Sequence, residues 1–234
     1  MEKFKLFEKI YNSLKRGIIP RVDLHVHTNW TDGQHSVFEM HEEACRKSLS
    51  HIFFSEHSRK ESGNWFLEFG KQVDSLSKSR CEAIKGTEVK ILNFEGELDM
   101  NENFYRESDL VMASVHRFPG ETSKDFRNKK TLKKDEVIKI EFELMIAALN
   151  NPKVDILGHP FGMTLNRFGY EPNDNLFDEL IIQCGKKNKI FEVNYRYHKN
   201  PKILIDKCLK NKTQISLGSN AHSKEELGKI LEIF

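Results

Sequence analysis

Two histidines, His25 and His27, are the first residues of the chain whose spacing suggests metal chemistry. Side chains two positions apart in an extended backbone point to the same face, so both imidazoles could bind one metal ion. A single histidine beside an apolar strand is more often a hydrogen-bonded core residue than a ligand. Other candidate ligands, however, recur in or just after the short apolar runs of the chain: Asp32, His57, Glu88, His116, His159, Asn220 and His222. The repetition favours one shared metal site.

The composition of this set restricts the metal. Imidazoles with a few carboxylates and no thiolate suit zinc, manganese or iron better than calcium or magnesium. A single catalytic ion takes three or four protein ligands, so the set predicts two or three divalent ions, with Glu88 as a bridge between two of them. The other four histidines fall on helices, loops or a strand start and are assigned no role: His35, His41, His51 and His198.

Clustered divalent ions predict hydrolysis of a phosphate ester. They lower the pKa of a bound water from about 15.7 toward about 7 and neutralise charge on phosphoryl oxygens, so we expect metal-activated hydroxide to be the nucleophile. The chain has no G-x-S-x-G motif, which disfavours covalent catalysis by serine. Guanidinium groups match phosphate oxygens, and three arginines near the proposed ligands are candidates for substrate binding: Arg59, Arg117 and Arg196.

The elements that must position these residues are short apolar runs separated by stretches of helical periodicity. The predicted strands are 22–26, 51–55, 83–91, 109–114, 154–157, 190–193 and 214–217. The predicted helices are 36–48, 64–79, 131–150, 174–187, 201–211 and 223–232. This alternation predicts parallel β/α units, as a closed barrel or an open doubly wound sheet. Both architectures build sites at the carboxyl ends of strands, where most of the candidates fall.

Length and composition indicate one large α/β domain. Of the 234 residues 38% are hydrophobic and the net charge is +2, which argues against sequence-independent nucleic-acid binding. An amphipathic helix is predicted within residues 1–20, before a single domain at 21–234. The four cysteines lie far apart, and neither a signal peptide nor a membrane span is evident. We therefore expect a cytoplasmic protein with reduced thiols and no membrane partner; the oligomeric state is open.

The ordered motifs resemble the polymerase and histidinol phosphatase (PHP) family, most closely the PHP domain of bacterial family-X DNA polymerases. The matching stretches are RVDLHVHTNWTDG, FFSEHS, GTEVKILNFEGELD, DLVMASVHRF, DILGHPFG, FEVNY and ISLGSNAHS. The resemblance implies a distorted (β/α)7 barrel with a trinuclear metal site. It also implies how the ligands are shared: His25, His27, Glu88 and Asn220 for the first ion; Glu88, His116 and His159 for the second; Asp32, His57 and His222 for the third.

Two positions depart from the family pattern. Asn220 stands where the family usually has aspartate, and S-E-H stands where it usually has T-D-H around His57. An amide oxygen can bind a metal but carries no charge, so the first ion should be held less tightly. Glu56 is expected to lie behind the ligands. The Asn220 change also leaves open a relative that kept the fold and lost the activity.

Three functions follow as hypotheses. The first is a phosphomonoesterase acting on a small molecule such as a sugar phosphate, a nucleotide or histidinol phosphate. The second is a 3'-5' exonuclease or another nuclease-type phosphodiesterase, suggested by the polymerase resemblance. The third is a catalytically impaired PHP module. Near-neutral charge and the absence of polymerase domains from the sequence favour the first.

Overall fold

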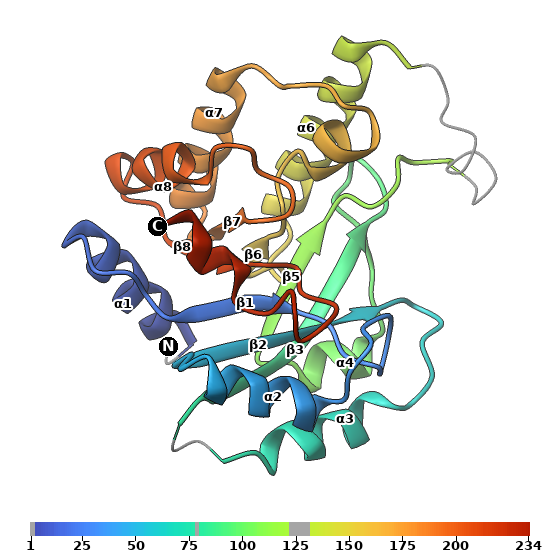
Figure 1. Cartoon of the computed structure of the whole chain (residues 1–234). Coiled ribbons are helices and arrows are strands. Elements are labelled where there is room, and N and C mark those ends of the chain that lie inside the picture. The colour runs from blue at the N-terminus through green and yellow to red at the C-terminus, as the bar shows by residue number, and fades with distance from the viewer. Residues whose placement is uncertain (1–2, 78–79, 122–131) are drawn as a thin grey trace.

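The computed structural model describes residues 3–77, 80–121 and 132–234. Helices and strands alternate along the chain, as the sequence predicts (Figure 1). The strands are β1 Val22–Val26, β2 His51–Ser58, β3 Glu82–Ile91, β4 Leu98–Asp99, β5 Leu110–Ser114, β6 Ile156–Leu157, β7 Ile190–Asn194 and β8 Ile215–Gly218. The α-helices are α1 Lys3–Lys15, α2 Val37–Arg46, α3 Phe66–Asp74, α4 Glu102–Glu107, α6 Lys134–Leu149, α7 Asp174–Lys186 and α8 Pro201–Lys210.

Seven parallel strands form a nearly closed barrel in the order β1-β2-β3-β5-β6-β7-β8, which confirms the predicted (β/α)7 barrel. The closure between β8 and β1 is the irregular part. One bridge, Val26 to Ala221, joins the two ends, and backbone bonds run from His27 N to Ala221 O and from Ala221 N to His25 O. This seam makes the barrel irregular and sets Ala221 beside His25 of β1 and His27, which follows β1.

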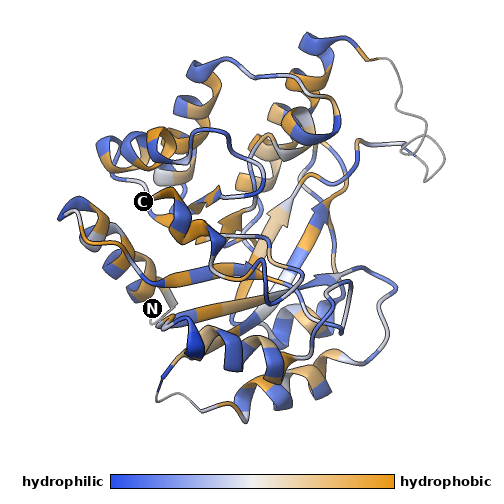
Figure 2. Cartoon of the chain, in the orientation of Figure 1, coloured by the Kyte–Doolittle hydropathy of each residue, from blue (hydrophilic) through white to orange (hydrophobic). Residues whose placement is uncertain are grey.

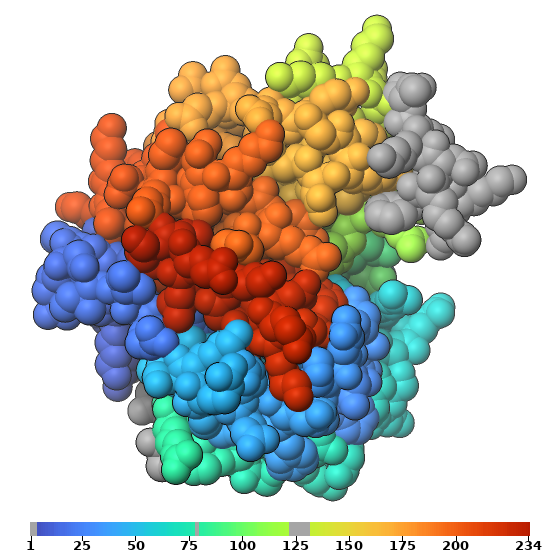
Figure 3. Space-filling model, viewed as in Figure 1, coloured from blue at the N-terminus to red at the C-terminus, as the bar shows by residue number. Residues whose placement is uncertain are grey.

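Buried apolar residues form two core clusters. In Figure 2 hydrophobic residues (orange) lie along the strands and recur on the helices. The larger core cluster includes Phe7 and Ile10 of α1, which contacts β8 and α8. The smaller cluster packs α2 and α3 against β1 and β2. In the space-filling view the C-terminal segment (red) crosses the face between the α2 region and the α7–α8 region (Figure 3). None of the described helices is long and apolar enough to cross a membrane.

The differences from the predicted elements are local. Three elements are too short to show a period and were not predicted: β4, α4 and a π-helical turn at Met163–Arg167. The helix predicted at 223–232 is wrong: the segment forms turns and a 3-10 helix at Lys229–Ile233. Gly228 interrupts it with a left-handed backbone (φ 76°) and donates its N–H to Asp23. Residues 124–131, the larger part of a highly charged stretch from Lys124 to Glu136, lie outside the described residues.

The Asp23 carboxylate replaces ladder hydrogen bonds at the seam. It accepts the N–H groups of Ser219 (2.8 Å) and Gly228 (2.7 Å) and is fully buried. Burial raises its pKa to about 6, although these two hydrogen bonds oppose the shift. The side chain therefore fixes the C-terminal segment onto β1.

Replacing Asp23 with alanine should destabilise the fold, because two buried N–H groups lose their acceptor. We expect a loss of about 2–4 kcal/mol in the free energy of unfolding, measured by urea denaturation. Asp206→Ala, at an exposed position of α8, is the control and should change stability by less than about 0.5 kcal/mol. Equal stabilities of the two variants would mean that Asp23 does not hold the seam.

Candidate metal centre

The strand register brings the candidate ligands together at the carboxyl ends of the strands. His57 on β2 is the direct register partner of Glu88 on β3. His116 follows β5 and His159 follows β6, the next two strands of the barrel. At the seam, the segment after β8 lies beside the end of β1, next to His25 and His27. Strands that are neighbours in the barrel therefore carry candidate ligands that are neighbours in the site.

The Glu88 carboxylate is the centre of the cluster. It is 1% exposed, and ring nitrogens of five histidines surround it. Oε1 lies 3.1 Å from His116 Nε2 and 2.8 Å from His159 Nε2. Oε2 lies 3.4 Å from His25 Nε2, 3.5 Å from His27 Nε2 and 3.4 Å from His57 Nδ1. Each oxygen thus faces its own set of imidazoles, as a bridging carboxylate requires.

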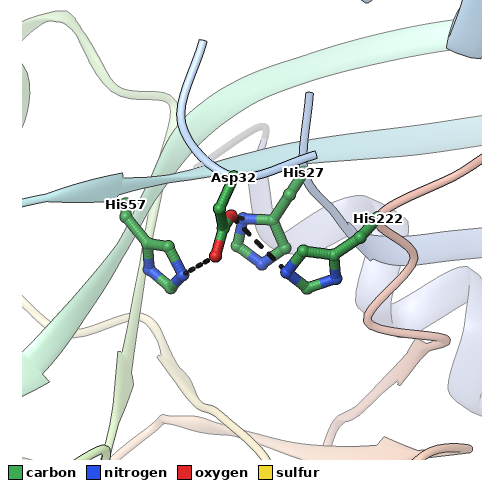
Figure 4. A group of neighbouring side chains, drawn as sticks. All are labelled: His27, Asp32, His57 and His222. Atoms are coloured by element: carbon green, nitrogen blue, oxygen red, sulfur yellow. Dashed lines mark ion pairs between the residues drawn. The ribbon is translucent and has the colours of Figure 1, made fainter. Parts of the chain in front are cut away.

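Asp32 is the centre of a second group, at the open side of the site (Figure 4). Its Oδ2 lies 3.3 Å from His57 Nε2, and its Oδ1 lies 3.4 Å from His222 Nε2 and 3.8 Å from His27 Nδ1. His27 and His57 therefore touch both carboxylates, one ring nitrogen toward each. The group around Glu88 and the group around Asp32 therefore share His27 and His57.

The spacing of these atoms fits metal coordination. Two ligands on a tetrahedral ion with bonds of about 2.05 Å lie about 3.3 Å apart. His25 Nε2 and His27 Nε2 are separated by 3.2 Å, and both are 3.4–3.5 Å from Glu88 Oε2. These three atoms have the separations of one face of such a tetrahedron. Within the described residues, three groups have ligand atoms close enough together to hold an ion: His27, Asp32, His57 and His222; His25, His27 and Glu88; and His57, Glu88 and His116.

Two further contacts set which ring nitrogen faces the site. His25 donates Nδ1–H to Glu192 Oε1 (2.8 Å), which turns Nε2 toward Glu88 and the proposed metal site. His222 donates Nδ1–H to the backbone oxygen of Asn220 (3.0 Å), which turns its Nε2 toward Asp32. The left-handed backbone of Asn220 (φ 54°) is part of this arrangement. Glu192 was missed by the sequence reasoning, although a carboxylate inside a buried strand is a signal that could have found it.

Glu56 holds the loop that carries Asp32. Its Oε1 accepts Thr28 N–H (2.8 Å) and the Thr28 hydroxyl (2.6 Å), and its Oε2 accepts the Thr31 hydroxyl. Burial raises the pKa of Glu56 to about 7, although these hydroxyls lower it. The carboxylate lies next to a proposed ligand in sequence, but its own bonds go to the loop.

The electrostatics of the centre follow from burying acids among imidazoles. Burial alone would raise the pKa of Glu88, but the charges of His116 and His25 hold it well below its usual range. Burial likewise would lower the pKa of His25, and Glu192 and Glu88 raise it to about 10 instead. Burial and the neighbouring His57 lower the pKa of His27, so this ring favours the neutral form that binds metals.

Asn220 and the three candidate arginines differ in burial. Asn220 is 5% exposed, and its Nδ2–H donates to the Tyr197 hydroxyl (3.3 Å). Arg59 and Arg196 are exposed, and Arg117 is half-buried beside His116. A phosphate-binding role for these three arginines stays a prediction.

The four histidines that were assigned no role lie outside the three groups. His198 is buried, accepts Asn194 N–H at Nδ1 (3.0 Å) and donates Nε2–H to Pro160 O (2.9 Å). His41 donates to Cys81 O (2.9 Å), and His51 lies at the start of β2. These bonds are those of structural histidines.

Comparisons with known proteins agree with the fold. The PHP domain family matches residues 23–196. A DNA polymerase/3'-5' exonuclease PolX of Bacillus subtilis is 32% identical over 74% of this chain, but the chain spans only 28% of that polymerase. A probable phosphatase of Thermoanaerobacter sp. is 28% identical, over 90% of this chain and 82% of the relative.

Among solved structures, a histidinol phosphate phosphatase of Lactococcus lactis, complexed with zinc, L-histidinol and phosphate, superposes with a TM-score of 0.64 at 17% identity. The match covers 91% of this chain and 93% of that one, and it shows a shared fold. The chain belongs to the PHP family, and with its cluster of histidines and carboxylates it is a metal-dependent phosphoesterase of that family.

Gly218 on β8 leaves room for the contact between His25 and Glu192. A Cβ at this position would collide with Glu192 Oε1 and would lie 2.6 Å from the Cβ of His25. We expect Gly218→Ala to displace the His25–Glu192 pair, to weaken metal binding, and to destabilise the fold by about 1–3 kcal/mol. Calorimetric metal titration and urea denaturation measure the two effects.

Gly63→Ala is the matched control, because a Cβ there meets nothing within 4 Å. It should leave metal affinity unchanged. If Gly218→Ala binds metal as tightly as the control variant, the close approach of Glu192 to His25 is not required for the site.

Proposed function

We propose that this protein hydrolyses a phosphomonoester of a small molecule, such as a sugar phosphate, a nucleotide or a compound of the histidinol phosphate type. The observation that carries the proposal is the pair of linked carboxylate-centred groups, with five imidazoles around Glu88 and a second set around Asp32. Two or three closely spaced divalent ions suit phosphoryl chemistry. The probable phosphatase relative, matched over most of its length, supports a small-molecule substrate.

We propose the following ligand sets. His25, His27, Glu88 and Asn220 hold the first ion, Glu88, His116 and His159 the second, and Asp32, His57 and His222 the third, with zinc, manganese or iron as the metals. The distances from Glu88 Oε1 to His116 and His159 support the second set. His57 also lies within reach of Glu88 and His116, so it is placed to serve two ions.

Bound divalent ions would supply activation of water and neutralisation of phosphate charge. The chain's own residues have separate tasks. Glu192 holds His25 with Nε2 toward the proposed metal site, and Glu56 fixes the Asp32 loop. Arg59, Arg117 and Arg196 are proposed to bind substrate phosphate. Residues 21–234 form the proposed phosphoesterase domain, which α1 supports through Phe7, Ile10 and the bond from the Tyr11 hydroxyl to Leu209 O.

A nuclease is the second candidate, because the polymerase relative has the higher identity, 32%. The two candidates differ in the substrate that is cleaved and in the product that is released. A catalytically impaired module is the third, motivated by the neutral Asn220.

A substrate panel tests the proposal. Chelator-treated protein is reloaded with manganese, zinc or iron and offered an aryl phosphate, phosphometabolites and labelled single-stranded DNA. We expect phosphate release from monoesters, with kcat/KM at least roughly tenfold above that for any DNA end. Preferential shortening of the DNA would favour the nuclease. Turnover of neither class, in protein with fewer than about one bound ion per chain after reloading, would favour the impaired module.

His116→Ala tests the ligand assignment. Loss of this ring removes one of the two imidazoles on Glu88 Oε1, so we expect loss of one ion and a fall in kcat of at least about 100-fold. Elemental analysis and phosphate release measure the two effects. His51→Ala, at the opposite end of β2, is the control. Full activity and unchanged metal content in His116→Ala would overturn the assignment.

A further inference from the structure

Tyr197 lies outside the expected ligand sets but contacts one proposed ligand in each of two sets. Its ring stacks on the His159 ring, with centroids 4.4 Å apart and planes at 28°. Its hydroxyl oxygen accepts Asn220 Nδ2–H at 3.3 Å. The side chain is half-buried, and it follows β7, so a separate segment of the chain joins the two proposed metal positions.

Asn220 has an unsatisfied group. Its Oδ1 is buried and has no hydrogen-bond partner within the described part of the chain, while its Nδ2 is bonded to Tyr197. Backbone bonds between Ala221 and the His25–His27 segment hold position 220 beside these two proposed ligands of the first ion. A buried amide oxygen without a partner costs about 1–3 kcal/mol, and a cation would remove that cost.

An amide has one end that can bind a metal and one that cannot. A carboxylate needs no such choice, because both of its oxygens are acceptors. We propose that Tyr197 is a positioning residue: its hydroxyl binds the amide nitrogen of Asn220 and so turns the amide oxygen toward the first metal ion. Stacking on His159 fixes the ring, so the hydroxyl has a defined place. This inference rests on the proposed role of Asn220 as a ligand.

The inference predicts a dependence between two positions. Tyr197→Phe keeps the ring and its stacking but removes the hydroxyl, so the amide loses its orientation. Asn220→Asp should tighten the first ion and make the hydroxyl unnecessary, because either carboxylate oxygen can face the metal. Loss of the hydroxyl should therefore matter with asparagine at position 220 and matter little with aspartate.

The experiment uses the full chain, freed of metal by chelation and titrated with Mn²⁺ alone in a calorimeter, with bound ions counted by elemental analysis. Tyr197→Phe should weaken the weakest-bound ion by roughly tenfold or more. In the Asn220→Asp background the same change should cost less than about threefold. Tyr195→Phe is the matched control: its hydroxyl bonds to Glu232 (3.0 Å), and its loss should not alter Mn²⁺ affinity.

Equal losses in both backgrounds, or no loss with asparagine at position 220, would overturn the inference. Any general effect of Tyr197→Phe on folding would appear in both backgrounds, and thermal unfolding of the metal-free variants measures it directly. The affinities do not depend on turnover. If wild-type protein binds Mn²⁺ but releases phosphate from no ester, the proposed function fails, and the inference is still judged by the two affinity differences.

Discussion

The buried Glu88 carboxylate is the interaction on which the rest of the site depends. An ionised carboxylate removed from water costs several kcal/mol unless opposite charge or hydrogen-bond donors compensate it. Here five imidazoles provide the surroundings, and each carboxylate oxygen has its own set. An imidazole that gives its lone pair to a metal gives no proton to Glu88, so divalent ions would supply the positive charge in the place of those protons.

The arrangement of the barrel strands positions these imidazole rings around Glu88. Glu88 meets His57 because β2 and β3 pair in parallel register, and it meets His25 only if β1 is held close by its neighbours. The seam between β1 and β8 has few backbone bonds, so a side chain, Asp23, completes it. Gly86 on β3 serves the same packing: a Cβ there would lie 2.8 Å from the Phe53 ring and would collide with Leu110 O. The interior tolerates little added volume.

Much of this could be predicted from the sequence because the strands are short apolar runs and the ligands are residue types with few other reasons to recur at strand ends. All seven barrel strands were predicted, and the candidate histidines and acids do meet. What escaped prediction depends on contacts between distant segments. Glu192 acquires its role from Gly218 and His25, and the helix expected at 223–232 fails because Gly228 bonds to Asp23, 205 residues away. No local pattern encodes such partners.

The neutral side chain at position 220 is best understood through charge. With aspartate at position 220, the proposed ligands of the first ion would carry two negative charges, one from that residue and one from Glu88. With asparagine, Glu88 is the one charged ligand proposed for the first ion. Glu192 partly offsets the difference, since a carboxylate bonded to His25 Nδ1–H makes Nε2 a stronger donor to a metal. The backbone of Asn220 meanwhile orients His222, a task that depends on its left-handed conformation and not on side-chain charge. Asparagine adopts that conformation readily, so the substitution keeps the geometry of the site while reducing its negative charge.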